Sequence, residues 1–158
     1  MAKKTRNKKK GGFSISNLAL LLAPFLFIYS LLFTIKYSFL WPFTKYKRLR
    51  AYVWAQAYHE TEGFTSSIYR QTSNCFGMKV PKQRDYSAIG RKTFSSGTYL
   101  VYFAPGQSLY DLFLYFDAVR FPTSVANLYE YVDELYQRGY FEDNPQTYYN
   151  GMKNALEL

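Results

Sequence analysis

Glu60 is the residue of this sequence best placed to do acid chemistry. A predicted helix that starts near Tyr46 carries three apolar residues, spaced four apart on one stripe: Leu49, Val53 and Ala57. Glu60 continues that stripe one turn later, and Gly63 then ends the helix. Burial and the negative end of the helix dipole both disfavour a carboxylate, so both raise the pKa of Glu60. A carboxyl group that stays protonated near neutral pH can protonate the oxygen of a glycosidic bond.

The residues next to Glu60 suggest no second catalytic group. Glu62 faces about 200° away on the helix and is predicted to be solvated. His59 is the only histidine, which excludes an internal His–His metal pair and leaves a catalytic triad without support. We therefore predict no metal site and no cofactor. On spacing alone, a structural glutamate paired with a lysine is the alternative for Glu60.

Positive charge is concentrated in the first third of the chain. The sequence has 20 Lys and Arg, 11 Asp and Glu, and a net charge of +9. From Ala51 onward, nine basic residues stand against 11 acidic ones, a balance of −2. A globular part that binds nucleic acid would ordinarily be basic itself, so we predict no nucleic-acid partner and place the basic clusters beside a membrane span.

An apolar stretch lies between those basic clusters. Eighteen residues without a charge run from Leu18 to Ile35, about enough to cross a hydrocarbon core of ~30 Å. A signal peptide is the alternative, but no small-x-small cleavage site follows the stretch. We predict a basic tail (1–12), a transmembrane anchor (13–36), a basic and aromatic juxtamembrane segment (37–50) and one catalytic domain (51–158). Three aromatic residues would mark the membrane interface: Trp41, Phe43 and Tyr46.

The rest of the domain is predicted to be mainly helical with one short β excursion. Residues 78–97 have the composition of an irregular or hairpin region, and Thr98 to Phe103 favour a strand. Pro105 and Gly106 turn the chain, and Ser108 then caps a helix. Another helix carries apolar residues from Val125 to Leu135 and stops at Gly139. The last helix opens with Asn144 as its cap and Pro145 at its first position. Cys75, the only cysteine, is expected to pack as a small apolar residue.

Two short motifs carry a family resemblance. Ala55, Gln56 and Ala57 precede Glu60 and Thr61, and the run Asn74 to Lys79 begins 14 residues after the acid. This arrangement resembles the glucosaminidase family of peptidoglycan hydrolases, which includes autolysins, flagellar muramidases and phage lysins. Downstream matches follow in the family's order, in three segments: Tyr99 to Asp111, Tyr131 to Tyr140, and the pair Tyr148 and Tyr149. The resemblance covers about residues 51–155.

The resemblance implies a lysozyme-like α+β fold whose groove binds the alternating GlcNAc and MurNAc glycan. Glu60 would be the general acid, and Tyr148 or Tyr149 would position the reacting sugar. Three further residues would bind substrate: Asn74, Phe76 and Tyr102. The register within the tyrosine doublet stays open.

One departure from the family concerns the second carboxylate. Family members often carry it on the β excursion, but residues 93–97 contain no acid, and Asp85 is the only carboxylate between Glu62 and Asp111. An inverting mechanism, with acid and base about 6.5–9.5 Å apart, would have to use Asp85. Otherwise the substrate's N-acetyl group takes part, or intramolecular attack gives an anhydro sugar.

The sequence therefore predicts a membrane-anchored glycosidase or lytic transglycosylase that cuts a β-1,4 bond of peptidoglycan. Its N-terminus would lie inside, with residues 13–36 in a viral membrane or a bacterial inner membrane and the domain facing the wall. Lipid, glycan strands and other virion proteins are the expected partners of such a lytic enzyme. The alternative is a catalytically weak or inactive membrane-anchored scaffold, or a glycan-binding protein, with the same fold.

Overall fold

Residues 40–157 are described by a computed structural model. The predicted tail (1–12) and anchor (13–36) lie outside the described residues. Within residues 40–157, no helix is both long enough and apolar enough to traverse a bilayer.

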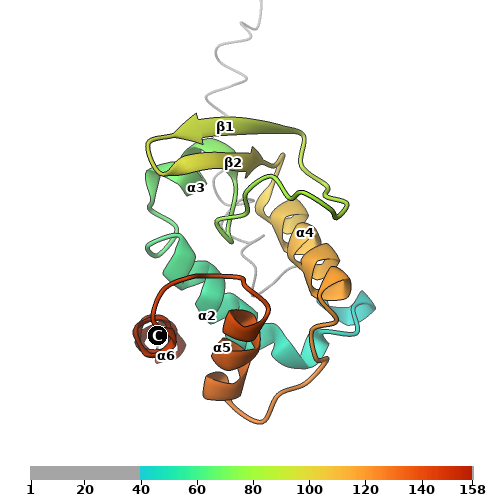
Figure 1. Ribbon diagram of the computed structural model, residues 1–158, viewed down its shortest axis with the longest axis vertical. Helices are drawn as coiled ribbons and strands as arrows, with labels where there is room; N and C mark the ends of the chain where they lie inside the picture. The colour runs from blue at the N-terminus through green and yellow to red at the C-terminus, as the bar shows by residue number, and fades with distance from the viewer. Residues whose placement is uncertain (1–39, 158) are drawn as a thin grey trace, which may run out of the picture.

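The described chain is mainly helical, with one two-stranded antiparallel hairpin, as predicted (Figure 1). Two short 3-10 turns come first, η2 (Trp41–Phe43) and η3 (Lys47–Leu49). The remaining elements, in chain order, are α2 (Arg50–Glu60), α3 (Ser67–Thr72), β1 (Gly90–Phe94), β2 (Gly97–Val101), α4 (Pro105–Ala118), α5 (Leu128–Gln137) and α6 (Pro145–Leu156).

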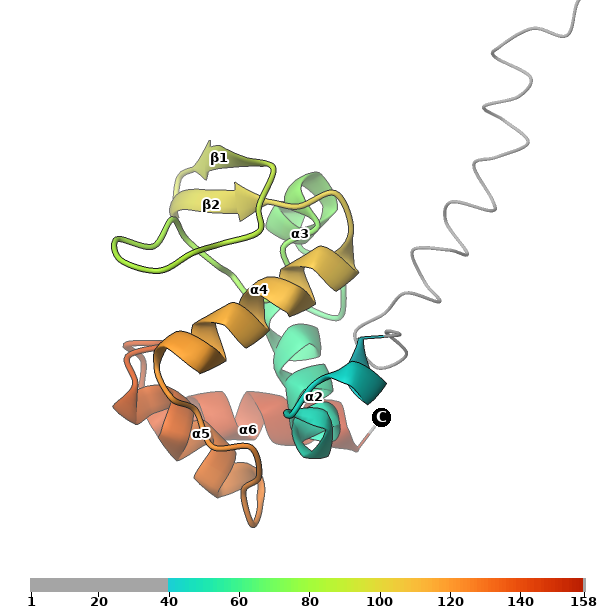
Figure 2. The same ribbon diagram turned by 90° about the vertical axis from the view of Figure 1, so that its right-hand side faces the viewer.

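The elements divide into two lobes. The hairpin lobe (residues 61–104) holds α3, β1 and β2 at one end of the molecule, and the helical lobe (residues 40–60 and 105–157) holds α5 and α6 at the other end (Figure 1). Figure 2 shows α2 and α4 extending between the two ends. The acid-bearing helix α2 therefore points its C-terminal end toward the hairpin lobe.

Helix α2 has the predicted amphipathic pattern. It begins at Arg50, later than the predicted start near Tyr46, and Leu49 is the last residue of η3. The stripe residues Leu49, Val53 and Ala57 are all fully buried. The helix ends where Thr61 donates its hydroxyl to the carbonyl of Ala57 at 2.6 Å and Gly63, at φ +68°, donates its N–H to Tyr58. The predicted stop is confirmed, because this left-handed conformation suits glycine.

Aromatic packing makes the core of the helical lobe. Trp41 and Tyr46 are 3% and 1% exposed, and both rings contact Phe113, at centroid distances of 5.5 and 5.7 Å. The hydroxyl of Tyr46 donates to Asp117 at 2.7 Å, while Phe43 is 84% exposed. Folded structure thus extends N-terminal to residue 51, into the predicted juxtamembrane segment. Trp and Tyr suit a protein core as well as a membrane interface, so their presence in the sequence does not distinguish the two.

The predicted start of one helix is confirmed, and that of another is wrong. Asn144 caps α6 by accepting from the N–H of Gln146 at 2.8 Å, as predicted. Helix α4, in contrast, begins at Pro105, whose fixed φ suits a first helical position. Ser108 lies inside α4 and accepts from the N–H of the fully buried Cys75 at 3.0 Å, so it joins the two lobes instead of capping a helix.

A buried ion pair fastens the hairpin lobe to α4. The carboxylate of Asp111 is fully buried and pairs with Arg84 at 3.0 Å. It also accepts from the N–H of Ser87 at 2.9 Å and from the hydroxyl of Tyr102 at 2.8 Å. Three groups therefore satisfy one buried carboxylate, which is what a buried charge requires.

Candidate active site

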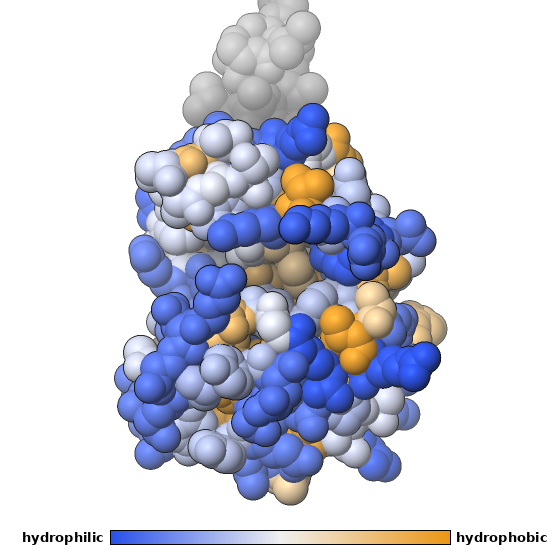
Figure 3. Space-filling view, in the orientation of Figure 1, coloured by the Kyte–Doolittle hydropathy of each residue, from blue (hydrophilic) through white to orange (hydrophobic). Residues whose placement is uncertain are grey.

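A groove of about 1170 Å³ runs between the two lobes. Figure 3 shows the hollow, with mostly hydrophilic residues along its borders. The hairpin lobe contributes the segment from Phe76 to Arg84 together with Tyr99, and the helical lobe contributes His59, Glu60, Tyr148 and the segment from Gly139 to Asp143. The volume slightly exceeds the ~300–1,000 Å³ typical of small-molecule pockets, so the groove has room for an extended ligand.

Glu60 is the last residue of α2 and lies in the wall of this groove. Its Oε1 accepts from the hydroxyl of Tyr148 at 2.6 Å. Its Oε2 lies beside Gly77, where a Cβ atom would come within 3.1 Å of it. Because Gly77 has φ +58° and no side chain, this oxygen keeps open space beside it.

The pKa of Glu60 is raised, chiefly because burial disfavours the carboxylate. The hydrogen bond from Tyr148 acts in the opposite direction, and the negative charge of Asp143 raises the pKa further. The net effect keeps Glu60 protonated to higher pH than an exposed glutamate, as the sequence predicted.

Tyr148 is the tyrosine of the doublet that reaches Glu60. Its ring stacks on that of Phe141 at a centroid distance of 4.1 Å and is T-shaped to that of His59 at 4.9 Å. Burial raises the pKa of Tyr148 well above its usual value, so its hydroxyl stays a donor. Tyr149 points elsewhere, contacts Tyr129 and does not line the groove.

His59 lies closer to the site than its adjacency to Glu60 suggested. It lines the groove and is half-buried, and burial lowers its pKa, which favours the neutral imidazole. A Cβ at position 151 of α6 would overlap its ring, so Gly151 leaves the room that the ring of His59 occupies between α2 and α6. The packing of His59 against Gly151 thereby helps to bring Tyr148 to the acid.

Asn74 and Phe76 shape the turn beside the groove. The buried side chain of Asn74 donates to the carbonyls of Met78 and Leu100, at 2.8 and 3.1 Å. It accepts from the N–H of Phe76 at 3.3 Å and from that of Met78 at 3.0 Å. Phe76 lines the groove, and its carbonyl accepts from the hydroxyl of Tyr140 at 2.6 Å. The amide side chain of Asn74 thus holds the turn, and the hydrogen bond from Tyr140 joins the turn to the helical lobe.

The structure does not bring Asn74, Tyr102 or Asp85, three of the predicted site residues, into the groove wall. Tyr102 is 3% exposed, and its hydroxyl is used by Asp111. The side chain of Asp85 is exposed on the loop before β1, where its backbone carbonyl accepts from Arg84 at 2.8 Å.

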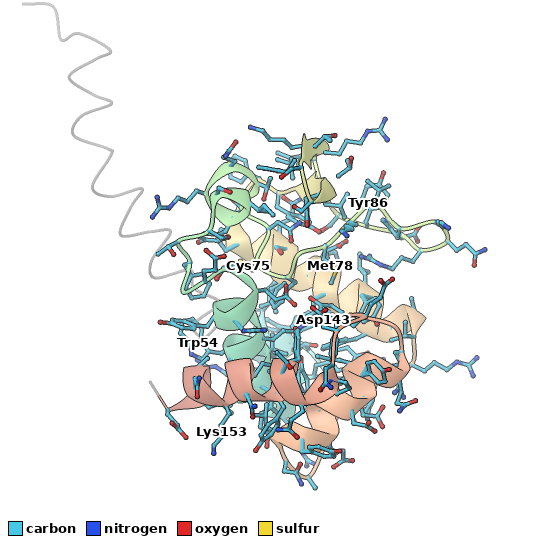
Figure 4. All side chains as sticks on the ribbon, turned by 60° about the vertical axis from the view of Figure 1, so that its left-hand side comes forward. Trp54, Cys75, Met78, Tyr86, Asp143 and Lys153 are labelled. Atoms are coloured by element: carbon cyan, nitrogen blue, oxygen red, sulfur yellow. The ribbon has the colours of Figure 1, made fainter. Side chains whose placement is uncertain are left out.

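Two carboxylates that the sequence interpretation missed do line the groove, Glu142 and Asp143. Figure 4 shows Asp143, on the loop before α6, and Met78, in the hairpin lobe, on opposite sides of the groove. The family resemblance indicates a second acid on the hairpin and so gives no reason to expect one before α6. In the sequence, the feature that points to Asp143 is its position directly before Asn144, the cap of the helix that carries Tyr148.

No group of three or more His, Cys, Asp or Glu side chains within residues 40–157 is arranged to hold a metal ion. Comparisons with models of protein families, with curated proteins and with solved structures found no match. A function for the groove must therefore follow from the chemistry of its own residues.

Proposed function

We propose that this protein is a membrane-anchored peptidoglycan glycosidase that cleaves a β-1,4 bond of the GlcNAc–MurNAc glycan. The observation that carries the proposal is a carboxyl group of raised pKa, Glu60, in the wall of a long groove, held by the hydroxyl of Tyr148 at 2.6 Å. A protonated, positioned carboxyl is the group that departure of a sugar alkoxide requires.

In the proposed reaction, Glu60 gives its proton to the glycosidic oxygen as the bond from C1 to that oxygen breaks. The leaving sugar departs as an alcohol, and C1 takes on oxocarbenium character. Because Tyr148 donates to Oε1, the proton is held on Oε2, the oxygen beside the open space at Gly77. The residue at 77 therefore controls access of the glycosidic oxygen to the acid.

Asp143 is our candidate for the second carboxylate. The groove-lining carboxylates of the described chain are Glu60, Glu142 and Asp143, and Asp143 is the one whose charge acts on Glu60. In hydrolysis Asp143 would take a proton from water as the water oxygen bonds to C1. A lytic transglycosylase would need no such water, since a sugar hydroxyl attacks C1 and forms an anhydro ring.

We include the fold family and the membrane location of the protein in the same proposal. A groove between a helical lobe and a hairpin lobe supports a lysozyme-like fold and the resemblance to the glucosaminidase family. We place residues 13–36 in a viral membrane or a bacterial inner membrane, with the domain facing the wall and other virion proteins as possible neighbours. A tether would supply the local concentration that a wall-binding module supplies elsewhere.

The decisive experiment compares the full-length protein with its Glu60→Gln variant on purified peptidoglycan. Loss of the acid is expected to lower the rate of turbidity clearing and of new reducing ends by about 10²–10⁴-fold. Glu62→Gln is the matched control, because Glu62 is exposed and two residues away. Equal clearing by wild type and Glu60→Gln would contradict the proposal, and mass spectrometry of the sugar ends separates hydrolysis from anhydro-sugar formation.

A glycan-binding scaffold without catalysis is the second candidate function. It is favoured by the absence of an acid on residues 93–97 of the hairpin, where the family often carries one. Glycan binding with neither reducing ends nor anhydro products would support it.

A further inference from the structure

The charged residues of the groove are sorted by sign between its two walls. The hairpin lobe contributes only cations, namely Lys79, Lys82 and Arg84, whereas the helical lobe contributes only carboxylates, namely Glu60, Glu142 and Asp143. Arg84 is occupied by its ion pair with Asp111. Lys79 and Lys82 are exposed and form no ion pair within residues 40–157. The hairpin wall therefore offers free positive charge to a ligand.

The pairing of the strands places a second lysine on the same face as Lys79, with Tyr99 between the two. Lys92 on β1 is paired with Tyr99 on β2, and Lys79 forms an isolated antiparallel bridge with the same Tyr99. Residues paired directly across antiparallel strands present their side chains on one face. Lys79, Tyr99 and Lys92 therefore form a row across one face of the hairpin, and this face borders the groove because Lys79 and Tyr99 line it.

Aromatic rings support both ammonium groups. The Nζ of Lys79 lies 5.7 Å from the ring centre of Tyr99, and the Nζ of Lys92 lies 5.9 Å from that of Phe94. The two rings meet edge to face at 5.9 Å. Gly97, paired with Phe94, adds no side chain to this surface. Since Tyr99 is only 9% exposed, its ring serves as a support for the lysines more than as a stacking platform for a sugar.

We propose that the row Lys79–Tyr99–Lys92 is a subsite for the carboxylate-bearing sugar of the glycan. This inference rests on the proposed function. The ammonium group of Lys79, in the groove wall, and that of Lys92, across Tyr99 on the same face of the hairpin, attract a carboxylate. The acidic groups of the opposite wall repel it. The carboxylate can be that of the lactyl ether or that of a peptide stem on the same sugar.

The consequence is a rule for which bond is cut. Acidic and neutral sugars alternate along the strand, so holding the acidic sugar at the row sets the register of the whole strand. Only one of the two kinds of β-1,4 bond then lies over Glu60. The row accordingly decides bond choice, while Glu60 performs the chemistry.

The test measures binding in the full-length Glu60→Gln protein, so that it needs no turnover. The ligands are a peptide-free GlcNAc–MurNAc tetrasaccharide, the same glycan with peptide stems, and neutral chitotetraose. Replacing Lys79 and Lys92 by Gln is expected to lower affinity for the acidic glycans by about tenfold and to leave chitotetraose binding unchanged. Retained chitotetraose binding also shows that the variant is folded.

The matched control replaces Arg91 and Lys153 by Gln. This pair removes the same net charge, and both side chains are exposed, but Arg91 is paired with Leu100 on the opposite face of the hairpin and Lys153 lies on α6. We expect the control to keep the preference for acidic glycans.

Loss of preference for the peptide-free glycan would assign the lactyl carboxylate, and loss confined to the stem-bearing glycan would assign the stem. An unchanged preference in the Lys79 and Lys92 variant would overturn the subsite. In proteins that retain Glu60, the sugar ends released from peptidoglycan should be uniform for wild type and mixed for the lysine variant. Failure of the proposed function would appear separately, as equal activity of wild type and Glu60→Gln.

Discussion

The two walls of the groove differ in how they are held together and in what they offer a ligand. The helical lobe is packed by aromatic rings, as in the stacked pair Phe116 and Phe121 at 4.2 Å, and it supplies the carboxyl groups. The hairpin lobe is pinned to α4 by polar contacts to one buried carboxylate, Asp111, and it supplies the cations. The proposed chemistry thus belongs to the wall packed by aromatic rings, and the proposed recognition belongs to the wall held by polar contacts.

The largest effect is expected from breaking the polar anchor. Asp111→Ala leaves the mostly buried Arg84 without its partner, which should lower the free energy of unfolding by about 3–5 kcal/mol. Hydrogen exchange should accelerate most in residues 84–102, with α5 and α6 less affected. Asp133→Ala, at an exposed position of α5, serves as the control and should stay within about 0.5 kcal/mol of wild type. Uniform acceleration across both lobes would contradict the contrast between them.

A comparable loss should follow from opening the aromatic core of the helical lobe. Trp41→Ala removes a ring packed against Phe113 and should cost about 3 kcal/mol in chemical denaturation. Phe43→Ala is the matched control, since Phe43 is 84% exposed two residues away. If both variants were equally stable, the segment before residue 51 would not belong to the core.

On the acidic wall, Asp143→Asn should lower the rate of hydrolysis by about 10²-fold if Asp143 activates the water. The same change removes a charge that raises the pKa of Glu60, so that pKa should fall. Because the acid must be protonated to work, the high-pH limb of kcat/KM should then move to lower pH. Glu142→Gln controls for loss of one groove charge, and an unmoved limb in Asp143→Asn would remove Asp143 from the site.

The smallest effect is expected for Tyr148→Phe, and it should shift the pH profile in the direction opposite to that of Asp143→Asn. The hydroxyl of Tyr148 lowers the pKa of Glu60, so its loss should raise that pKa and move the high-pH limb of kcat/KM to higher pH. Activity should fall about tenfold, because Oε1 loses its donor and the acid is less well oriented. Tyr149→Phe should change neither quantity. A shift to lower pH in Tyr148→Phe would contradict the assigned hydrogen bond.

Features set by local chemistry were predictable from the sequence. The stripe that ends at Glu60 repeats with the helical period, and Asn144 followed by Pro145 marks a helix start by its own hydrogen bonding and φ preference. The start of α4 was mispredicted because Ser108 has a cap's chemistry but uses its hydroxyl across the lobes, on Cys75. The burial of Trp41 and Tyr46 escaped prediction because their partner Phe113 lies far along the chain.

The sequence by itself determined that a glutamate would end an apolar helical stripe, and that helices would dominate with one short hairpin. Only the tertiary structure decided which tyrosine meets Glu60, because that contact spans 88 residues and depends on α6 packing against His59 at Gly151. It also decided which side chains share the groove with the acid. Asp143 enters by the path of the loop before α6, and Lys92 joins Lys79 by strand register, which no local pattern encodes.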